Sequence, residues 1–241
     1  MMTPGGSFDA WAADYDRALA QGVSLSGEDK EYFAEGRVRW LARCLDAFGA
    51  QARDVLDFGC GTGTNTEVLG RTLRARVVGV DPSEASIQVA RARHPDATLA
   101  FERLVAGEAC ERFDLAFCNG VFHHIPLAER GPAVRHVYAS LRPGGIFALW
   151  ENNPWNPGTR LVMRRIPFDR DALLLAPGEA RRLLRAAGFE IVSTTYQFIF
   201  PHGLRLFRPA ERIVAGLPFG AQYQALGRKP QAGCGSTGPL P

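Results

Sequence analysis

The chain has 241 residues, of which 46% are hydrophobic and 22% are charged, and its formal net charge is +3. This composition excludes disorder over the whole chain, and it excludes a fibrous protein because the glycines and prolines follow no three-residue period. The charge is too small to indicate a nucleic-acid surface by itself, and no apolar run approaches the ~20 residues that span a bilayer, so we expect neither partner.

Two helices are predicted in the first fifty residues. The first covers Phe8–Leu19, and the second begins after Ser26, the expected N-cap, and runs to about Phe48. The apolar residues of the second helix recur at the spacing of one helix face. Residues 1–50 are therefore predicted to form a helical cover over the rest of the protein.

Short apolar runs alternate with amphipathic stretches from residue 51 to residue 230. Buried parallel strands have this pattern, because crossover helices join them. The predicted strands lie at 55–58, 76–80, 98–101, 113–118, 145–150, 190–200 and 222–227. They predict an α/β domain with a doubly wound, mostly parallel seven-stranded sheet and a reversed strand at one edge, followed by a flexible tail at 231–241.

Two segments interrupt this alternation. In 152–176, Pro154 and Pro157 remove backbone donors that a regular helix or strand would need. The second segment, 201–220, contains three further prolines. We predict that both are irregular and that they form an inserted lid on the ligand side of the sheet.

The most informative motif follows the first predicted strand. Asp57 ends this strand, Gly59, Gly61 and Gly63 follow it, and Asp81 ends the second strand. Glycines allow a tight turn and the close approach of a ligand, and an acid in the position of Asp81 can bind the hydroxyls of a ribose. A dinucleotide site would need a third glycine at 64, which is Thr64. A carboxylate at Asp57 would repel a pyrophosphate and suits the ammonium of an amino acid, which points to S-adenosylmethionine and against a nicotinamide dehydrogenase.

These residues resemble the class I S-adenosylmethionine-dependent methyltransferases of the small-molecule branch. Further matches in order are Gly79–Ser83, Phe113–Pro126 and Leu141–Gly145, with Phe8–Asp9 and Tyr15–Asp16 in the N-terminal helix. The resemblance implies a Rossmann-like methyltransferase fold, an enzyme, and S-adenosylmethionine as its cofactor. It implies that the cofactor contacts are Asp57, Gly59, Cys60, Gly61, Asp81, Pro82, Asn119 and Tyr15. The acidic residue that often binds the adenine amine in this family has no clear counterpart in Phe101–Leu104. Glu102 or a backbone carbonyl could take its role, and the sequence leaves this choice open.

The catalytic candidates are His124, Glu151 and His123. The histidines follow the fourth predicted strand and Glu151 follows the fifth, at the sheet edge where ligands bind in α/β proteins. A histidine there can be a general base near neutral pH, or it can orient its loop. We expect no metal, because no carboxylate cluster accompanies the histidines.

The acceptor candidates lie in the two interrupting segments: Asn152, Trp155, Arg160, Arg164 and His202. Arginine binds carboxylate or phosphate with two parallel hydrogen bonds, so an anionic acceptor is one interpretation. A solvated helix face is the other interpretation for these arginines.

The predicted function is methyl transfer to a small-molecule acceptor, with oxygen favoured as the methylated atom. A base is needed only when the acceptor is poorly ionised. The alternative is a non-catalytic S-adenosylmethionine-binding regulator or pseudoenzyme partner. The chain start shows no secretion signal and the five cysteines include no C-x-x-C pair, so a cytoplasmic protein is expected, with its oligomeric state open.

Overall fold

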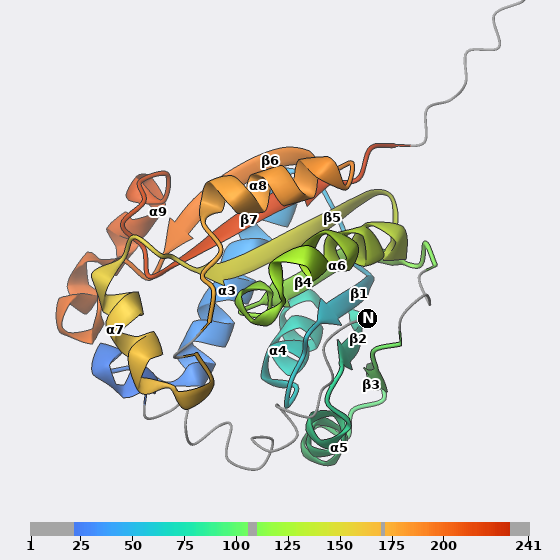
Figure 1. Ribbon diagram of the computed structural model, residues 1–241, viewed down its shortest axis with the longest axis horizontal. Helices are drawn as coiled ribbons and strands as arrows, with labels where there is room; N and C mark the ends of the chain where they lie inside the picture. The colour runs from blue at the N-terminus through green and yellow to red at the C-terminus, as the bar shows by residue number, and fades with distance from the viewer. Residues whose placement is uncertain (1–21, 106–109, 170–171, 232–241) are drawn as a thin grey trace, which may run out of the picture.

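The computed structural model describes residues 22–105, 110–169 and 172–231. A seven-stranded sheet in the order β3-β2-β1-β4-β5-β7-β6 forms its centre (Figure 1). The strands are β1 Asp54–Phe58, β2 Arg76–Asp81, β3 Leu99–Arg103, β4 Phe113–Asn119, β5 Leu141–Asn152, β6 Glu190–Gln197 and β7 Gln222–Arg228. All seven predicted strands are present. The predicted helix at Phe8–Leu19 lies outside the described residues, as does the tail apart from Gln231.

The position of the reversed strand differs from the prediction. β7 is antiparallel to both of its neighbours and lies between β5 and β6, so β6 forms the edge. Burial explains this order, because Tyr223 to Gly227 of β7 are buried without interruption, whereas most of β6 is only half-buried. A strand that is apolar on both faces is stabilised inside a sheet, and the Ser and Thr residues of β6 tolerate the edge.

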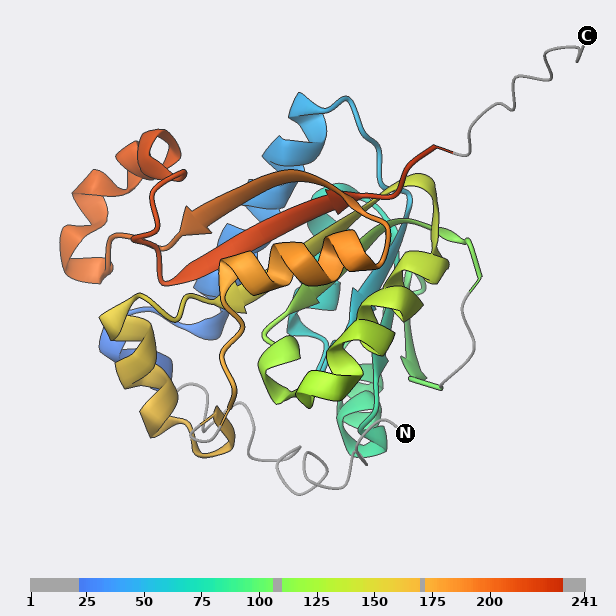
Figure 2. The same ribbon diagram turned by 45° about the horizontal axis from the view of Figure 1, so that its top comes forward.

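Helices cover both faces of the sheet (Figures 1 and 2). Helices α6 (Leu127–Ser140) and α8 (Pro177–Ala186) pack on one face, where Val134, Val137 and Leu184 join a buried cluster with Phe58. Helices α3 (Lys30–Ala47) and α4 (Thr64–Leu73) contribute to the cluster on the other face. Helix α5 (Glu84–Arg93) packs against β3 through Ile87. This arrangement leaves the carboxyl ends of the parallel strands for the site.

The long helix α3 has the predicted buried face but begins at a different residue. Asp29 is its N-cap, because its carboxylate accepts a hydrogen bond of 2.7 Å from the backbone N–H of Tyr32. The hydroxyl of Ser26 donates to Val23 O instead and closes the short helical turn Ser24–Ser26. Two competing caps so close in sequence are equivalent locally, and the loop conformation selects Asp29.

The two interrupting segments contain more regular structure than predicted. Residues 152–176 include α7 (Pro157–Arg165), which begins with Pro157 at its first turn and Asn156 as its N-cap. A proline at that place is compatible with a helix, because its missing N–H would have no partner. The second segment holds a 3-10 helix, η4 (His202–Ala210), and α9 (Glu211–Val214). Among the described residues, no helix combines the length and the apolar character that crossing a membrane requires.

Candidate active site

The turn between β1 and α4 brings backbone close to any ligand at the end of the sheet. Gly59, Gly61 and Gly63 all have positive φ angles, of 77°, 53° and 86°. A Cβ at Gly59 would collide with the side chain of Val121, and one at Gly63 would lie 2.9 Å from the Phe101 ring. The loop therefore needs glycine at all three places for conformation, and at Gly59 and Gly63 for space as well.

Asp81 connects the end of β2 to this turn. Its carboxylate accepts hydrogen bonds from the backbone N–H of Gly61 at 3.0 Å and of Ser83 at 2.9 Å. Pro82 follows it and leads into α5. The neighbouring Cys60 is buried, and burial raises the pKa of its thiol well above the usual value, so it packs rather than reacts.

Asp57 is a buried carboxyl group at the end of β1. It is 1% exposed, and its Oδ2 accepts a hydrogen bond of 2.6 Å from the Thr66 hydroxyl. Burial, together with the nearby charge of Asp81, raises its pKa to about 7, although Thr66 and the guanidinium of Arg37 act in the opposite direction. A cation beside this group would stabilise its ionised form.

The end of β4 provides a further polar atom without a partner. The amide oxygen of Asn119 is buried and accepts no hydrogen bond from the described residues. The orphaned oxygen of Asn119, the buried acid Asp57 and the open backbone at Gly61, where a Cβ would meet nothing within 4 Å, are what an ammonium-bearing nucleoside would need. These residues fit S-adenosylmethionine. Tyr15, the remaining predicted contact, lies outside the described residues, and Glu102 is exposed on β3.

A cavity of about 420 Å³ opens beside Asn119 and Gly120. Most of its wall is apolar or aromatic, with side chains from α3, α7 and the chain after β6, among them Tyr32, Phe33, Leu161, Met163, Phe198 and Phe200. One group of polar lining residues faces the ends of β4 and β5 and consists of Asn119, His123, His124, Asn152 and Asp169, while others, among them Glu28, Lys30, Arg37 and Arg208, come from α3, the loop before it and the segment after β6. A ligand in this cavity would contact mostly apolar surface, with the first of these polar groups at the end that faces the sheet.

Two histidines and two carboxylates form a connected group at that end. His123 Nδ1 lies 2.7 Å from Oε2 of Glu151, whose Oε1 accepts the backbone N–H of Phe122. On the other side, Asp169 Oδ1 lies 3.5 Å from His123 Nε2 and 3.2 Å from His124 Nε2. Glu151 is fully buried and does not line the cavity, whereas both histidines and Asp169 do.

The two histidines have opposite pKa shifts. Burial alone would lower the pKa of His123, but the Glu151 and Asp169 carboxylates outweigh it and raise this pKa to about 10. Burial lowers the pKa of His124, and the charge of His123 adds to that effect. Burial acts to raise the pKa of Asp169, but hydrogen bonds from both histidines lower it to about 2. At neutral pH, His123 is therefore cationic, Asp169 is anionic and His124 is neutral.

The same group is the one that could hold a metal. Among the residues that the structure describes, donor atoms of His123, His124 and Asp169 lie within 4.8 Å of one another. The sequence prediction of no metal rested on the lack of a nearby carboxylate, and Asp169 supplies one. We nevertheless interpret the group as a hydrogen-bonded proton network. His124 and Asp169 lie at hydrogen-bonding distance, and the Glu151 carboxylate binds His123 from behind.

Four of the five predicted acceptor residues are not among the described residues that line this cavity. Arg160, Arg164 and Trp155 are exposed, and the imidazole of His202 is bound to Glu28 at 3.0 Å. Only Asn152 lines it, where its side chain accepts a hydrogen bond from Gln222. On α7 the apolar face turns to the cavity, and the arginines lie on the solvent side.

Asp169 and Arg37 are site residues that the sequence reasoning missed. Asp169 lies close to a part of the chain that is tied to the histidines, where the Leu173 N–H donates to His123 O and the buried Arg130 donates to Leu173 O. Arg37 lies on α3, 6% exposed, and its guanidinium donates to Gln222 and Asn65. For Arg37, the sequence offered one signal, because a charged residue on the buried face of a predicted helix is unusual. For Asp169 it offered none.

Comparisons with known proteins identify the family of the chain. Residues 56–147 match the family model described as a methyltransferase domain. A trans-aconitate 2-methyltransferase from Azoarcus sp. is 31% identical over 187 residues, which cover 74% of this chain and 69% of that protein. A ubiquinone biosynthesis O-methyltransferase from Alkalilimnicola ehrlichii is 31% identical over 156 residues, 61% of each chain. The matches span from about half to about two thirds of the length of such curated relatives.

Solved structures show the same fold. A methyltransferase from Thermotoga maritima, described as a possible histamine N-methyltransferase, superposes with a TM-score of 0.63 and 20% identity, covering 93% of this chain and 99% of that one. Three observations lead to one conclusion: the glycine turn after β1, the acid Asp81 at the end of β2, and the similarity to known methyltransferases. The chain belongs to the S-adenosylmethionine-dependent methyltransferase family, and its cofactor is S-adenosylmethionine.

Proposed function

We propose that this protein methylates an oxygen atom of a small molecule with a largely apolar body. The observation that carries this proposal is the cavity beside Asn119, whose wall is apolar and whose polar end holds the His124–Asp169 pair. An apolar wall binds a ring or chain without specific polar contacts, and the polar end selects the reacting atom.

The cofactor contacts are proposed from the geometry at the ends of β1, β2 and β4. S-adenosylmethionine supplies, when bound, a methyl group already activated on a sulfonium. Asp57 holds the ammonium of its amino-acid end, and the guanidinium of Arg37, which interacts electrostatically with Asp57, holds the carboxylate. Asp81 binds the ribose hydroxyls, and Asn119 contacts the methionine portion. Aligning two reactants in this way can account for ~7–11 kcal/mol of a barrier.

His124 is the proposed general base. Its Nε2 faces the anionic Asp169, which fixes the N–H on that atom and leaves the lone pair on Nδ1. The imidazole is neutral near pH 7 because its pKa is lowered, so Nδ1 would accept the proton of an acceptor hydroxyl. Bound S-adenosylmethionine would supply the methyl group: the new O–CH3 bond would form as the S–CH3 bond breaks, S-adenosylhomocysteine would leave, and His124 would return the proton to solvent.

His123 and Glu151 act as positioning residues in this proposal. Glu151 is wholly buried behind His123, and it also holds the backbone N–H of Phe122, so it fixes the turn that carries both histidines. The cationic His123 keeps Asp169 ionised and close to His124. The fixed network holds the base in one orientation.

We favour a neutral acceptor because the basic side chains that line the cavity already have partners. Lys30 donates to Thr64, and Arg37 donates to Gln222 and Asn65. Arg208 lines the cavity, but Glu28 binds its guanidinium at 2.6 Å. The arginines of α7 that suggested an anion are not among the described lining residues. The name of the ubiquinone relative, an O-methyltransferase, supports an oxygen acceptor, while the trans-aconitate relative acts on an anion.

A direct test incubates the protein with S-adenosylmethionine and a panel of acceptors, and product mass is measured. Phenols and alcohols with apolar bodies are expected to gain one methyl group, and polycarboxylates of similar size are not. Faster turnover of polycarboxylates would reverse the proposed acceptor class. Cofactor binding with no product from any acceptor would favour the alternative, a non-catalytic S-adenosylmethionine-binding regulator.

A further inference from the structure

The segment of residues 202–219, which we call the knob, exposes an unusual amount of apolar surface. It comprises η4, α9 and the turn after them, and neither helix has a buried residue. Leu206 and Ile213 are each 87% exposed, and four more large apolar side chains are between 46% and 61% exposed: Leu204, Phe207, Leu217 and Phe219. Single exposed apolar residues are normal, but six large ones within one segment of eighteen residues indicate a contact surface.

Charged side chains make most of the knob's side-chain contacts with the protein, beside a ring contact of Phe207 with Phe200 and the buried Ala215. Glu211 turns inward, and its carboxylate accepts the backbone N–H groups of Ile199 and Phe200 at 3.0 and 2.9 Å. Arg208 donates to Glu28 at 2.6 Å and lies over the ring of Tyr32 at 4.6 Å. The knob is thus anchored through its polar residues, which leaves Leu206 and Ile213 facing outward by construction.

Unpaired positive charge accompanies this apolar surface. Arg205 and Arg212 belong to the knob, and Arg43 on α3 faces Arg212 closely enough that, after the effect of burial, Arg212 lowers the pKa of Arg43. Within the described ranges, neither Arg43 nor Arg212 forms an ion pair with a carboxylate. The only acid of the knob, Glu211, is engaged by backbone. An apolar surface with a basic rim is complementary to an anionic lipid headgroup layer.

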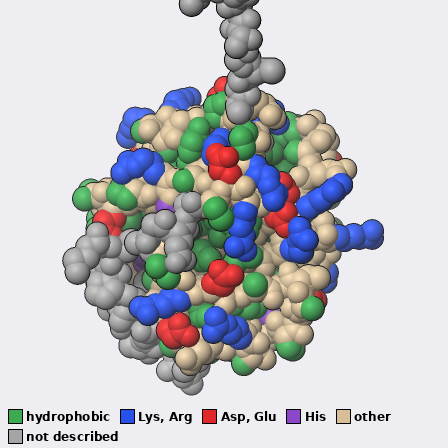
Figure 3. Space-filling view, turned by 90° about the vertical axis from the view of Figure 1, so that its right-hand side faces the viewer, with side chains coloured by type: hydrophobic (Ala, Val, Ile, Leu, Met, Phe, Trp, Pro, Cys, Tyr) green, Lys and Arg blue, Asp and Glu red, His purple; other side chains and the backbone are tan. Residues whose placement is uncertain are grey.

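The knob also adjoins the cavity. Arg208 of the knob and the preceding Phe200 and Pro201 line the cavity wall. Figures 1 and 2 show η4 and α9 projecting beside α7 at the end of the molecule where β6 stops. The opposite side, shown in Figure 3, carries basic and acidic side chains interspersed among apolar ones.

We propose that the knob is a peripheral contact surface for an anionic lipid bilayer. Leu206, Phe207 and Ile213 enter the interfacial region, and Arg205, Arg212 and Arg43 meet the headgroups. The expectation of no membrane partner rested on the lack of an apolar run long enough to span a bilayer. A surface that only touches the membrane interface needs no such run. In this orientation a wall of the cavity lies near the bilayer, and an apolar acceptor dissolved there has a short path to the site.

The test is sedimentation of the full chain with vesicles of phosphatidylcholine alone or of two parts phosphatidylcholine to one part phosphatidylglycerol. The wild type is expected to bind the mixed vesicles more tightly than the neutral ones. The double variant Leu206→Glu/Ile213→Glu should lose binding by roughly tenfold or more, because buried apolar surface and charge both contribute. The double variant Arg43→Glu/Arg212→Glu should lose binding to the mixed vesicles only.

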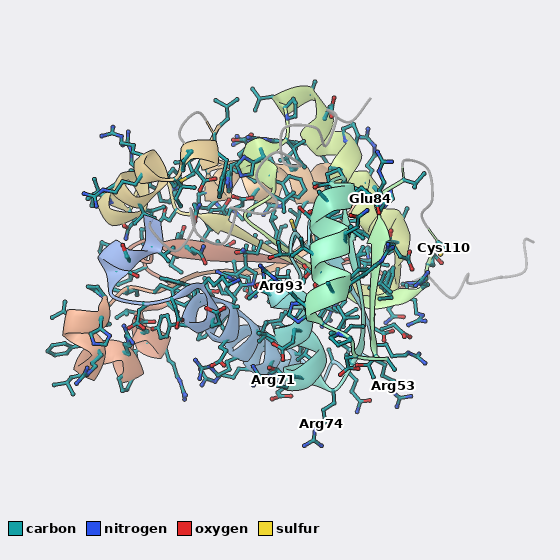
Figure 4. The ribbon with its side chains drawn as sticks, turned by 90° about the horizontal axis from the view of Figure 1, so that it is seen from below. Arg53, Arg71, Arg74, Glu84, Arg93 and Cys110 are labelled. Carbon is teal, nitrogen blue, oxygen red and sulfur yellow. The ribbon has the colours of Figure 1, made fainter. Side chains whose placement is uncertain are left out.

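Matched controls lie away from the knob. Leu127→Glu changes a side chain that is 62% exposed on α6, and Arg74→Glu changes an arginine that projects into solvent at the end of α4 (Figure 4). Both should bind vesicles like the wild type. Unchanged circular dichroism and S-adenosylmethionine binding verify that the knob variants fold.

Three outcomes would overturn the proposal. The wild type could ignore both vesicles, the control variants could lose as much binding as the knob variants, or light scattering could show a dimer that Leu206→Glu/Ile213→Glu dissociates. The last result would assign the knob to self-association. Vesicle binding is measured without methyl transfer, so these outcomes do not bear on the proposed reaction.

Discussion

The Nε2 atom of His124 lies 3.2 Å from Oδ1 of Asp169, although the two residues come from separate segments. His124 follows β4, and Asp169 ends a short turn after α7. Their contact depends on the fixed chain at Leu173, which hydrogen-bonds to His123 O. An imidazole held this way has a defined tautomer, and this gives the proposed site a base in a largely apolar cavity.

Replacing the base should slow the reaction without affecting the cofactor. His124→Gln is expected to lower kcat for a hydroxyl acceptor by roughly a hundredfold to ten-thousandfold, the usual contribution of a general base. Binding of S-adenosylmethionine, measured by calorimetry, should stay unchanged. In the wild type saturated with S-adenosylmethionine, kcat/KM for the acceptor should be level at neutral pH and should fall as the pH drops through the His124 pKa, which lies below 6.5.

His136→Gln is the matched control for this prediction. His136 is a partly buried histidine on α6 that packs against Phe58 and is not among the cavity-lining residues. Its kcat should equal that of the wild type. An unchanged kcat in His124→Gln would remove this histidine from the mechanism.

The buried Asp57 should make cofactor affinity depend on pH. Its pKa of about 7 in the free protein lies above the ordinary aspartate value of 3.8, so the carboxyl must lose a proton to meet an ammonium. Affinity for S-adenosylmethionine is therefore expected to rise from about pH 6 to about pH 8. Methylthioadenosine lacks the amino-acid end, so its affinity should not change across this pH range. In the variant Asp57→Asn, the affinities for both ligands should be independent of pH.

The raised pKa of Asp57 also makes the stability of the free protein depend on pH. Because the folded state holds the Asp57 proton more tightly than the unfolded state, this group stabilises the fold fully below about pH 3.8 and loses that contribution as pH rises toward 7. Thermal unfolding should show a larger stabilisation by S-adenosylmethionine at pH 8 than at about pH 6. A pH-independent thermal shift would contradict the raised pKa.

Arg37 should recognise the carboxylate of the cofactor. Arg37→Met is expected to weaken S-adenosylmethionine binding by about tenfold or more, since a charge-assisted hydrogen bond contributes ~1.5–3 kcal/mol. Decarboxylated S-adenosylmethionine should bind the variant and the wild type equally. An equal loss for both ligands would indicate that Arg37 only supports the fold, through Gln222 and Asn65. Arg71→Met, at a surface ion pair with Glu67, is the control (Figure 4).

A chelator separates the proton network from a metal site. Dialysis against EDTA is expected to leave kcat unchanged, because His123, His124 and Asp169 are engaged with one another and with Glu151. A loss of activity that added Zn²⁺ or Mn²⁺ restores would replace the general-base mechanism with metal activation of the acceptor. Metal analysis of the purified protein provides a second measurement.

The sequence alone determined the turn that we propose as the cofactor end of this protein, because that turn is built from neighbours along the chain. Strand β1, the glycines from Gly59 to Gly63 and the acid Asp81 form one local unit, so periodicity and glycine placement predicted it. The order of the strands along the chain followed from the same patterns. Ser26 and Asp29 were locally equivalent caps, and the choice between them required the loop conformation.

Only the tertiary structure decided the acceptor end, because its contacts join distant segments. Packing set β7 between β5 and β6, turned the arginines of α7 to solvent, and brought Asp169 to His124 and Arg37 toward Asp57. Each depends on which face of an element is buried against a neighbour, and a one-dimensional pattern carries no information about that neighbour. The exposure of Leu206 and Ile213 was likewise decided by the tertiary structure, because the charged residues beside them make the contacts that hold this segment to the protein.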